Sequence, residues 1–418
     1  MPDKKKYQGI KGEYEMKTKL HFVVLVALLV VFVSGCGKVT QSGKTEATWA
    51  ERPETTEPHE PIVRKATLAV VGDIMVHDYQ FNEAYDASTG NYDFMHNFQD
   101  MKKYFEGRDF VIGNLETTFG GPEKKYSSFP MFNTPDSFLD ALKDAGFNLV
   151  TTANNHSMDT FQSGVVRTLD KLDEFYIEHV GTYRSQEERD KILIKEVNGI
   201  EFAFLSYTYG TNGISVPKPY LVSLLDEEKV RQDIAKAKKM ADMVIILPHM
   251  GNEYESEPND TFKGWADIMF EAGADMILAS HPHVLQPMEY RMIENGDGTQ
   301  RKGFICYSLG NFISSQTTPP RNASIVLHIT VEKTDDEKPI IQEVSFVPIW
   351  TQFRNAKNQN HFVVRSVYTM LSIPQEEIYQ TIRQKDHARL QDIHYETTSL
   401  LLGNEVPFAE IQDEYVIK

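Results

Sequence analysis

Five short polar clusters, each directly after an apolar run, carry the residue types that bind divalent metals. They contain carboxylates, an amide and imidazoles, which are ligands for manganese, iron and zinc. The motifs are Gly-Asp-Ile-Met at Asp73, Asn-Leu-Glu at Glu116, Asn-Asn-His-Ser-Met-Asp at Asn155, Pro-His-Met-Gly at His249, and Ser-His-Pro-His at His281 and His283. Two cations about 3.5–4 Å apart share a bridging carboxylate, activate a water and hold phosphoryl oxygens. The clusters therefore predict a site for metal-dependent hydrolysis.

Apolar runs of strand length precede all five clusters. They lie at residues 67–71, 110–112, 148–152, 243–247 and 276–279. Helix-like segments alternate with them, at residues 98–105, 137–145, 164–175, 227–240 and 262–272. This alternation predicts an α/β fold with both sheet faces covered. Because ligands bind at the carboxyl ends of parallel strands, we expect the clusters to meet at one edge of one sheet.

Two further regions have a different pattern. Residues 192–195 and 201–206 flank Asn198-Gly199, a strong signal for a β-hairpin. Beyond Val284, residues 290–293, 303–307, 323–331 and 340–348 resemble antiparallel strands, whereas the last part of the chain is polar and more helical. We therefore expect a domain at residues 65–350 and a mostly helical C-terminal extension at residues 351–418.

Each cluster also has an ordinary structural explanation. Gly72-Asp73 and Asn154-Asn155 are compatible with turns, and a single histidine such as His249 is commonly a hydrogen-bonded structural residue. The His281-Pro-His283 segment is compatible with a plain loop. What favours a metal site is the coincidence of ligand-type residues at five separate strand ends.

The N-terminus has the features of an export signal. A basic segment begins at Met16, which is a better start than Met1, and an apolar run from Leu20 to Val33 precedes Ser-Gly-Cys36. That run is shorter than the ~20 residues of a membrane-spanning helix. Val-Ser-Gly-Cys resembles the lipobox of bacterial lipoproteins, which implies a signal peptide at 1–35 and a lipid on Cys36. The protein would then sit on the extracytoplasmic face of the cell membrane. An uncleaved N-terminal anchor is the alternative.

Residues 36–64 are polar and read as a flexible tether. The formal charge of the whole chain is −17, and residues 1–35 carry six lysines against three acids, so the rest is about −20. Such a charge excludes an electrostatic surface for nucleic acid. If Cys36 carries lipid, Cys306 is unpaired, and its apolar neighbours predict a buried thiol.

Six ordered motifs together resemble one family. They are Gly-Asp-Ile-Met, Asn-Leu-Glu, Asn-Asn-His-Ser-Met-Asp, His-x-Gly-x-Glu-Tyr, His-Pro-His-Val-Leu-Gln and Tyr-Ser-Leu-Gly-Asn-Phe, between about Ala66 and Ser314. This order is similar to that of the CapA-type capsule synthesis proteins. These are poly-γ-glutamate biosynthesis proteins related to the calcineurin-like metallophosphoesterases. The resemblance implies a four-layer α/β/β/α sandwich with mixed sheets.

The resemblance also implies a role for each motif residue. Asp73 and His283 would hold one metal, Asn155, His249 and His281 would hold the second, and Glu116 would bridge them. His156 would be the catalytic acid, oriented or balanced by Asp159 or Glu253. Asn114, Ser308 and Asn311 would line the rim of the site.

Three residues depart from the expected motifs. Met75 stands where the phosphoesterase superfamily has a histidine, and a thioether is a poor ligand for hard cations. His77 is a possible substitute ligand. Glu116 replaces the superfamily's bridging aspartate, and Met250 replaces a tryptophan usual in the CapA pattern. One metal, or one tightly and one weakly bound metal, is therefore an alternative to a full pair.

Two functions remain open from the sequence. The first is a metal-dependent hydrolase acting on a phosphoester, or on an amide or ester, during production or export of an anionic polymer. The second is a non-catalytic accessory subunit that uses the same fold to bind the polymer or its membrane-embedded synthase. A capsule role rests on the resemblance alone.

Overall fold

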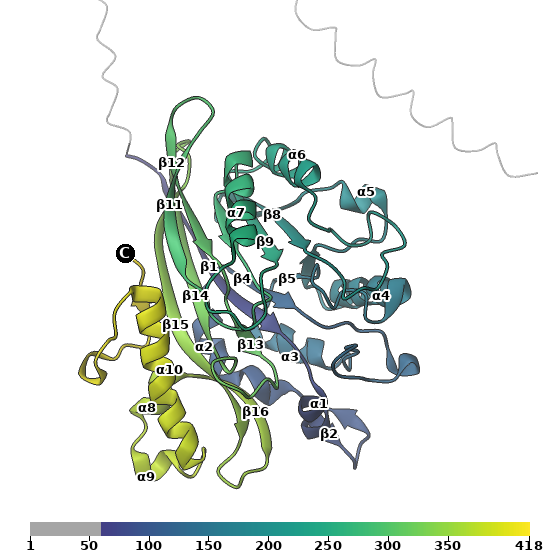
Figure 1. Cartoon of the computed structure of the whole chain (residues 1–418), viewed down its shortest axis with the longest axis vertical. Coiled ribbons are helices and arrows are strands. Elements are labelled where there is room, and N and C mark those ends of the chain that lie inside the picture. The colour runs from purple at the N-terminus through teal and green to yellow at the C-terminus, as the bar shows by residue number, and fades with distance from the viewer. Residues whose placement is uncertain (1–59) are drawn as a thin grey trace, which may run out of the picture. The chain divides into compact units, whose positions relative to one another are not determined.

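Two mixed β-sheets lie face to face in residues 60–418, the part of the chain that the computed structural model describes (Figure 1). The first has the strand order β16-β15-β14-β1-β4-β5-β6, with β13 on β1 and β17 on β15. Its strands are β1 (Val63–Ile74), β4 (Phe110–Leu115), β5 (Leu149–Thr151), β6 (Glu178–Val180), β13 (Asn311–Ile313), β14 (Ala323–Thr334), β15 (Ile340–Arg354), β16 (Asn360–Ser366) and β17 (Tyr415–Val416).

The second sheet has the order β11-β12-β10-β9-β8-β7. Its strands are β7 (Leu193–Val197), β8 (Ile200–Thr208), β9 (Met243–His249), β10 (Met276–Leu278), β11 (Met288–Glu294) and β12 (Gln300–Cys306). Strands β8, β9, β10 and β12 are parallel, as are β1, β4, β5 and β6 of the first sheet. A separate two-stranded ribbon pairs β2 (Tyr85–Asp86) with β3 (Asn91–Tyr92).

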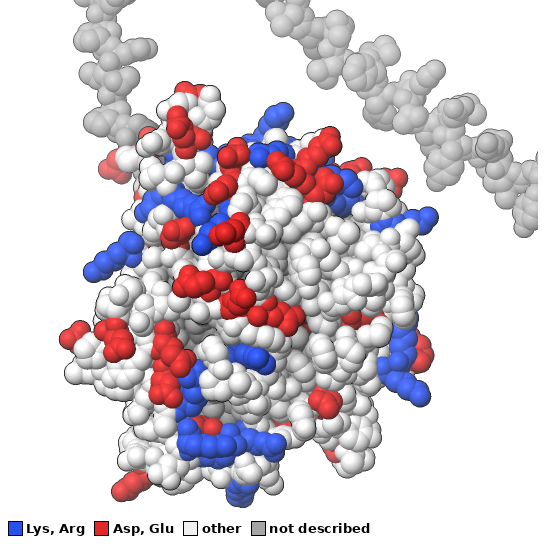
Figure 2. Space-filling model, viewed as in Figure 1, with Lys and Arg blue, Asp and Glu red and all other residues white. Residues whose placement is uncertain are grey.

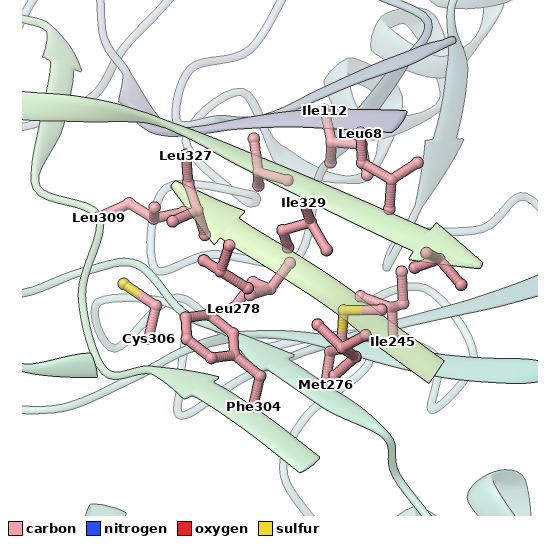
Figure 3. Packing of buried hydrophobic residues seen from close by; sticks show 14 of the residues in the cluster. Leu68, Ile112, Ile245, Met276, Leu278, Phe304, Cys306, Leu309, Leu327 and Ile329 are labelled. Atoms are coloured by element: carbon pink, nitrogen blue, oxygen red, sulfur yellow. The ribbon is translucent and has the colours of Figure 1, made fainter. Parts of the chain in front are cut away.

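The main hydrophobic core fills the space between the two sheets. Leu68 and Leu327 of the first sheet lie in one cluster with Ile245 and Phe304 of the second, and each is fully buried (Figure 3). Cys306 lies in the same cluster as a free, buried thiol, as the sequence predicts. Burial raises the pKa of this thiol to about 12, so it is neutral at physiological pH.

Helices cover the outer face of each sheet. The first is covered by η1 (Met95–Met101), α2 (Lys102–Phe105), α3 (Phe138–Ala145) and α4 (Phe161–Glu174). On the second lie α6 (Glu227–Ala237) and α7 (Asp260–Ala272). The remaining helices are α1 (Asp78–Ala84), η2 (Pro122–Lys124), α5 (Gln186–Arg189), α8 (Val367–Ser372), α9 (Gln375–Ile378), α10 (Gln384–Leu402) and η3 (Phe408–Glu410). The two outer clusters and the central one define four layers, so the expected α/β/β/α sandwich is confirmed.

The predicted boundary at residue 350 is wrong, although helices α8 to α10 do follow it. Strand β15 runs through this position to Arg354, and β16 and β17 add to the first sheet. The reason is a continued apolar pattern: Phe353, Phe362 and Val364 are buried. Trp350 then packs in one cluster with residues of α8 and α10 (yellow in Figure 1), so the C-terminal part is built into the sandwich.

The expected hairpin at Asn198-Gly199 is present, with both residues at positive φ between β7 and β8. The predicted signal peptide, Cys36 and most of the predicted tether lie outside the described residues. Strand β1 begins at Val63, just inside the predicted tether. Among residues 60–418, no helix has both the length and the apolar character needed to cross a membrane.

Gly72 allows β1 to approach the loop before β13 closely enough to place Asp73. A β-carbon at Gly72 would lie 1.9 Å from the carbonyl oxygen of Gly310. That same oxygen accepts a hydrogen bond of 2.9 Å from the backbone nitrogen of Asp73. The glycine in the first motif is therefore a packing requirement.

We predict that Gly72→Ala lowers the free energy of unfolding by about 1–3 kcal/mol, because two backbone segments must separate to admit the methyl group. Chemical denaturation of the purified variant measures this. Gly264→Ala is the matched control, since Gly264 lies within α7 with nothing near its would-be β-carbon. It should gain about 0.5–1 kcal/mol from helix propensity. Equal stability of the two variants would contradict the packing argument.

Candidate metal centre

The five sequence clusters meet where the carboxyl ends of the parallel strands of both sheets come together. Asp73 lies near the end of β1, paired with Asn114 of β4 and Asn311 of β13. Glu116 follows β4 directly, and His249 is the last residue of β9. The expectation of a single sheet is therefore wrong. The first sheet supplies the carboxylates and the second the histidines, because the two sheets stack with these ends on the same side.

Glu116 belongs to two groups of side chains that can hold a metal. Ligand atoms of Asp73, Glu116 and His249 lie within 4.8 Å of one another, and so do those of Glu116, His281 and His283. We call these sets the Asp73 triad and the His283 triad. All five residues are buried. A carboxylate common to two such sets is positioned as a bridging ligand.

The contacts of Glu116 Oε1 fit a cation-binding role. This atom is buried and has no hydrogen-bond partner within residues 60–418. It lies 3.6 Å from His249 Nε2 and 3.8 Å from His283 Nε2. His281 Nδ1 is also buried without a partner in that part of the chain. Buried polar atoms are rarely left unpaired, so the donor set fits one or two divalent cations of the manganese, iron or zinc type.

Asn155 joins His249, as the resemblance implies, since its Oδ1 lies 2.7 Å from His249 Nε2. His283 Nδ1 lies 3.1 Å from Asp73 Oδ2, so these two residues are in contact. The metal-binding groups nevertheless place Asp73 with His249 and His283 with His281, which differs from the division between two metals that the resemblance implies. His281 lies between the two groups. Its ring centroid is 4.8 Å from that of His249 and 5.9 Å from that of His283, although its ligand atom groups with the His283 triad.

Burial and neighbouring charge set the protonation states in the centre. Burial raises the pKa of Glu116 well above its usual range, and the charge of Asp73 raises it further. Burial alone would raise the pKa of Asp73, but hydrogen bonds and charges from His283 and Asn114 outweigh it and lower that pKa. Burial lowers the pKa of His281 to about 3 and that of His249 well below its usual range, and nearby histidines add to both shifts. The neutral imidazoles are the form that binds metal.

Asn114 is a buried hub and does not line a solvent-exposed rim. Its Nδ2 donates to Asp73 Oδ1 at 2.8 Å and lies 3.4 Å from Glu116 Oε2. Its Oδ1 accepts from the Thr151 hydroxyl at 2.8 Å. The sequence-based rim assignment is wrong here because residue 114 lies inside β4. Asn114 therefore holds both carboxylates in place through hydrogen bonds from its side-chain nitrogen.

Asn311 and Ser308 are buried as well, so neither lies at an exposed rim. Asn311 Oδ1 accepts from His283 Nδ1 at 3.0 Å, while Asn311 Nδ2 donates to the backbone oxygen of His283 at 3.2 Å. The hydroxyl of Ser308 accepts from the Gly310 nitrogen at 3.2 Å. Asn311 therefore orients the His283 ring, which leaves Nε2 directed toward Glu116. Ser308 shapes the loop.

The histidine loop is held in a strained conformation. His281 has φ 107° and His283 has φ 60°, both in the left-handed region that non-glycine residues avoid. Each costs about 1–3 kcal/mol and persists where its surroundings enforce it. The nitrogen of Tyr254 donates to the Pro282 oxygen at 2.8 Å, which helps to hold the loop. Such strain is typical of ligand-binding segments.

His156 is held by Asp159. Its Nδ1 donates to Asp159 Oδ2 at 2.7 Å, and its ring packs edge-on against Phe132 at 4.6 Å between centroids. Asp159 Oδ2 also accepts from the Phe132 nitrogen at 2.6 Å. Of the two residues expected to orient His156, the structure therefore brings only Asp159 into contact with it. Glu253 is exposed and acts on the centre only through its charge.

His77 does not replace the histidine that is missing at Met75. It belongs to neither triad. Its Nδ1 lies 3.2 Å from the Ser315 nitrogen and 3.3 Å from Gln80 Oε1, next to the start of α1. Burial lowers its pKa to about 4. Met75 is itself buried, so the Asp73 triad has three ligand groups from the described residues and lacks the motif's usual histidine.

Three residues near the centre were not among the predicted site residues, although Tyr254 ends the His-x-Gly-x-Glu-Tyr motif. Tyr209 covers His281 at 4.6 Å between ring centroids, and Tyr254 lies 5.9 Å from His283. The guanidinium carbon of Arg321 lies 3.5 Å from the Tyr254 ring centroid. Tyr209 directly follows the end of β8, so the strand-end rule would find it. No sequence rule would place Arg321 there.

Sequence comparisons with known proteins agree on a family. A family model described as bacterial capsule synthesis protein PGA_cap matches residues 67–316. The PGA biosynthesis protein CapA of Bacillus subtilis strain 168 is 30% identical over 76% of this chain and 79% of its own. The capsule biosynthesis protein CapA of Bacillus anthracis is 30% identical over 72% and 74%. The calcineurin-like phosphoesterase YfkN of Bacillus subtilis aligns with a TM-score of 0.40 at 13% identity, covering 79% of this chain and 99% of that one.

We predict that Glu116→Gln loses more bound metal than Asp73→Asn, because Glu116 serves both triads and Asp73 only one. Elemental analysis of the purified proteins, after equilibration with manganese or zinc and removal of free metal, gives the number of ions per chain. Asp159→Asn is the matched control, since this buried carboxylate contacts His156 and belongs to neither triad. Wild-type metal content in Glu116→Gln would contradict the bridging position.

Proposed function

This chain belongs to the bacterial capsule synthesis family PGA_cap, and we propose that it is a membrane-anchored protein of capsule production or export with a metal-dependent hydrolytic centre. The reaction we assign is cleavage of a phosphoester, or of an amide or ester, in an anionic polymer or its precursor; poly-γ-glutamate is the polymer that the family resemblance implies. The observation that carries the proposal is the position of Glu116, shared by two triads, with Oε1 unpaired within residues 60–418.

Divalent cations held by the two triads would supply an activated water and polarise the bond to be cleaved. The protein's own contribution begins with Asp73, Asn114 and Asn311, which hold the ligand atoms in place before substrate binds. Burial excludes bulk water from this set and strengthens each electrostatic contact.

His156 is the residue to protonate the leaving oxygen. Because Nδ1 donates to Asp159, Nε2 is the nitrogen left to carry or accept the transferred proton. The neighbouring residue Asn155 contacts His249, so the segment that carries the imidazole also contacts one of the metal-binding histidines. This arrangement fixes both the tautomer and the ring orientation.

We predict that His156→Ala lowers turnover of a generic phosphodiester, such as bis-p-nitrophenyl phosphate, by about 10²–10⁴-fold while metal content stays at the wild-type value. Release of p-nitrophenol by the metal-loaded full-length protein measures the rate. His179→Ala is the matched control, because His179 also pairs with an aspartate, Asp173 at 3.1 Å, but lies outside the centre. No turnover by the wild type, or equal rates in all three proteins, would reject hydrolysis of this bond.

The alternative is an accessory subunit that binds the polymer or its membrane synthase without catalysis. It is favoured by the missing histidine at Met75, which leaves the Asp73 triad with fewer ligands. Capsule output in cells separates the two functions. The hydrolase requires His156, so His156→Ala should be as defective as a deletion. The accessory role requires attachment, so it tolerates His156→Ala but not Cys36→Ala.

The anchoring proposal rests on the sequence. A lipid on Cys36 would hold the protein on the extracytoplasmic face of the cell membrane, where it would meet exported polymer and a membrane synthase. Figure 2 shows a band of acidic side chains across the middle of one face of the described part. Contact with a polyanion must therefore be local, at cations near the centre.

Arg321 is the protein cation best placed for such contact. Its side chain lies on the face of Tyr254, and its backbone oxygen accepts a hydrogen bond from Asn311 at 3.0 Å. Within residues 60–418 its guanidinium forms no salt bridge with a carboxylate. An arginine without an acidic partner, next to the metal ligands, is suited to bind a phosphate or carboxylate of the substrate.

We predict that Arg321→Ala raises KM for an anionic substrate by about tenfold, equivalent to ~1.4 kcal/mol, with a much smaller effect on kcat. Initial rates over a range of substrate concentrations, at low and moderate salt, separate the two constants. Arg231→Ala is the matched control, because Arg231 on α6 is already paired with Glu227 at 2.8 Å. A loss confined to kcat would contradict a role in substrate binding.

A further inference from the structure

A second group of metal-binding side chains lies outside the centre. Glu83 near the end of α1, His96 in η1 and His361 in β16 each offer one ligand atom, and these atoms lie within 4.8 Å of one another. Their side chains are 16%, 32% and 32% exposed, respectively. Unlike the buried triads, this set is open to solvent, and we call it the surface triad.

Both imidazoles of the surface triad point to the same carboxylate. His96 Nε2 lies 2.9 Å from Glu83 Oε2, and His361 Nδ1 lies 3.6 Å from Glu83 Oε1. The two rings are nearly parallel, with an interplanar angle of 7° and centroids 5.5 Å apart. Three donor atoms from three separate elements therefore converge on one point near the surface.

A buried amide holds the two histidines side by side. Asn97 is 1% exposed, and its Nδ2 donates to the backbone oxygen of Phe362 at 2.5 Å. This bond joins the neighbours of His96 and His361, so it brings η1 and β16 into the register that places the two rings together. Asn97 Oδ1 is buried without a hydrogen-bond partner in the described part of the chain, so this polar group is incompletely satisfied.

An ordinary ion pair explains the surface triad less well than a metal. Asp173 and His179 form such a pair elsewhere in the described part of the chain, with a single imidazole on the carboxylate and Arg184 as its second partner. At the surface triad two imidazoles share one carboxylate, and protonating both would place two positive charges close together. Zinc-type cations bind imidazole nitrogens and carboxylate oxygens. The surface triad offers two such nitrogens and one carboxylate, so it is a suitable donor set.

We propose that Glu83, His96 and His361 bind one divalent cation of the zinc type, with its remaining coordination position open to solvent. The ion would fasten α1 and η1 to β16, which are otherwise far apart in the sequence. Helix α1 begins directly after His77, so this site would brace the segment that leads from the Asp73 strand. The proposal does not depend on the hydrolytic function.

The test is zinc binding to the metal-stripped full-length protein, measured by competition with a chromophoric chelator. We expect His96→Ala and His361→Ala each to lose one equivalent relative to the wild type, or to weaken it at least about tenfold. The double variant should lose no more than either single one. The control His179→Ala should keep every equivalent. Wild-type zinc binding in both single variants would overturn the proposal.

A second measurement separates this site from the buried centre and from misfolding. In the Glu116→Gln background, zinc should raise the melting temperature, and adding His361→Ala should abolish that rise. Without metal, the two proteins should melt within a few degrees of each other, because His361 is partly exposed. An equal zinc-dependent rise with and without His361→Ala would show that the ion binds elsewhere. Cobalt gives an independent readout, since its visible absorption at this site should disappear with either histidine.

Discussion

Two fully buried carboxylates, Asp73 and Glu116, lie in one small site, and the residues around them offset part of the cost of burying these charges together. Burying like charges together is costly unless cations, hydrogen bonds or protons compensate them. Asp73 receives that compensation from Asn114, His281 and His283. Glu116 receives less compensation. Asn114 Nδ2 lies 3.4 Å from its Oε2, but its Oε1 has no hydrogen-bond partner within residues 60–418, and burial together with the charge of Asp73 raises its pKa. A bound cation would supply the charge compensation that Glu116 Oε1 lacks.

The two-sheet architecture places these groups together. Strand β1 contributes Asp73 only because Gly72 allows the backbone of Gly310 to approach it. The second sheet brings His249 at the end of β9 and the histidine loop after β10, whose positive φ angles direct two rings to one side. The asparagines inside β4 and β13 then set the orientation of the ligands. The metal centre therefore forms only where the two sheets meet, because each sheet supplies part of its ligands.

The surroundings of the centre add features that bear on substrate choice. The chain is acidic overall, at −17, yet Arg321 and its supporting Tyr254 lie beside the metal ligands. Arg321 lies beyond the region matched by the family model, which ends at residue 316. The C-terminal strands belong to the same sheet as β1, so this later part of the chain contributes to the framework of the centre.

Much of the centre follows from the sequence alone. Ligand-type residues at strand ends predicted Asp73, Glu116, His249 and the histidine loop, because the carboxyl end of a parallel strand is where a loop can present a side chain. The alternation of strand-like and helix-like segments predicted the α/β fold, and the family resemblance carried by the motif order implied the four layers. The sequence did not determine which sheet each strand joins, or that Asn114 and Asn311 are buried supports. It also did not show that Arg321, the surface triad and the strands β16 and β17 lie where they do. These features depend on contacts between residues that are distant in the chain. Local sequence patterns do not specify such contacts, because they form only when the two sheets pack together.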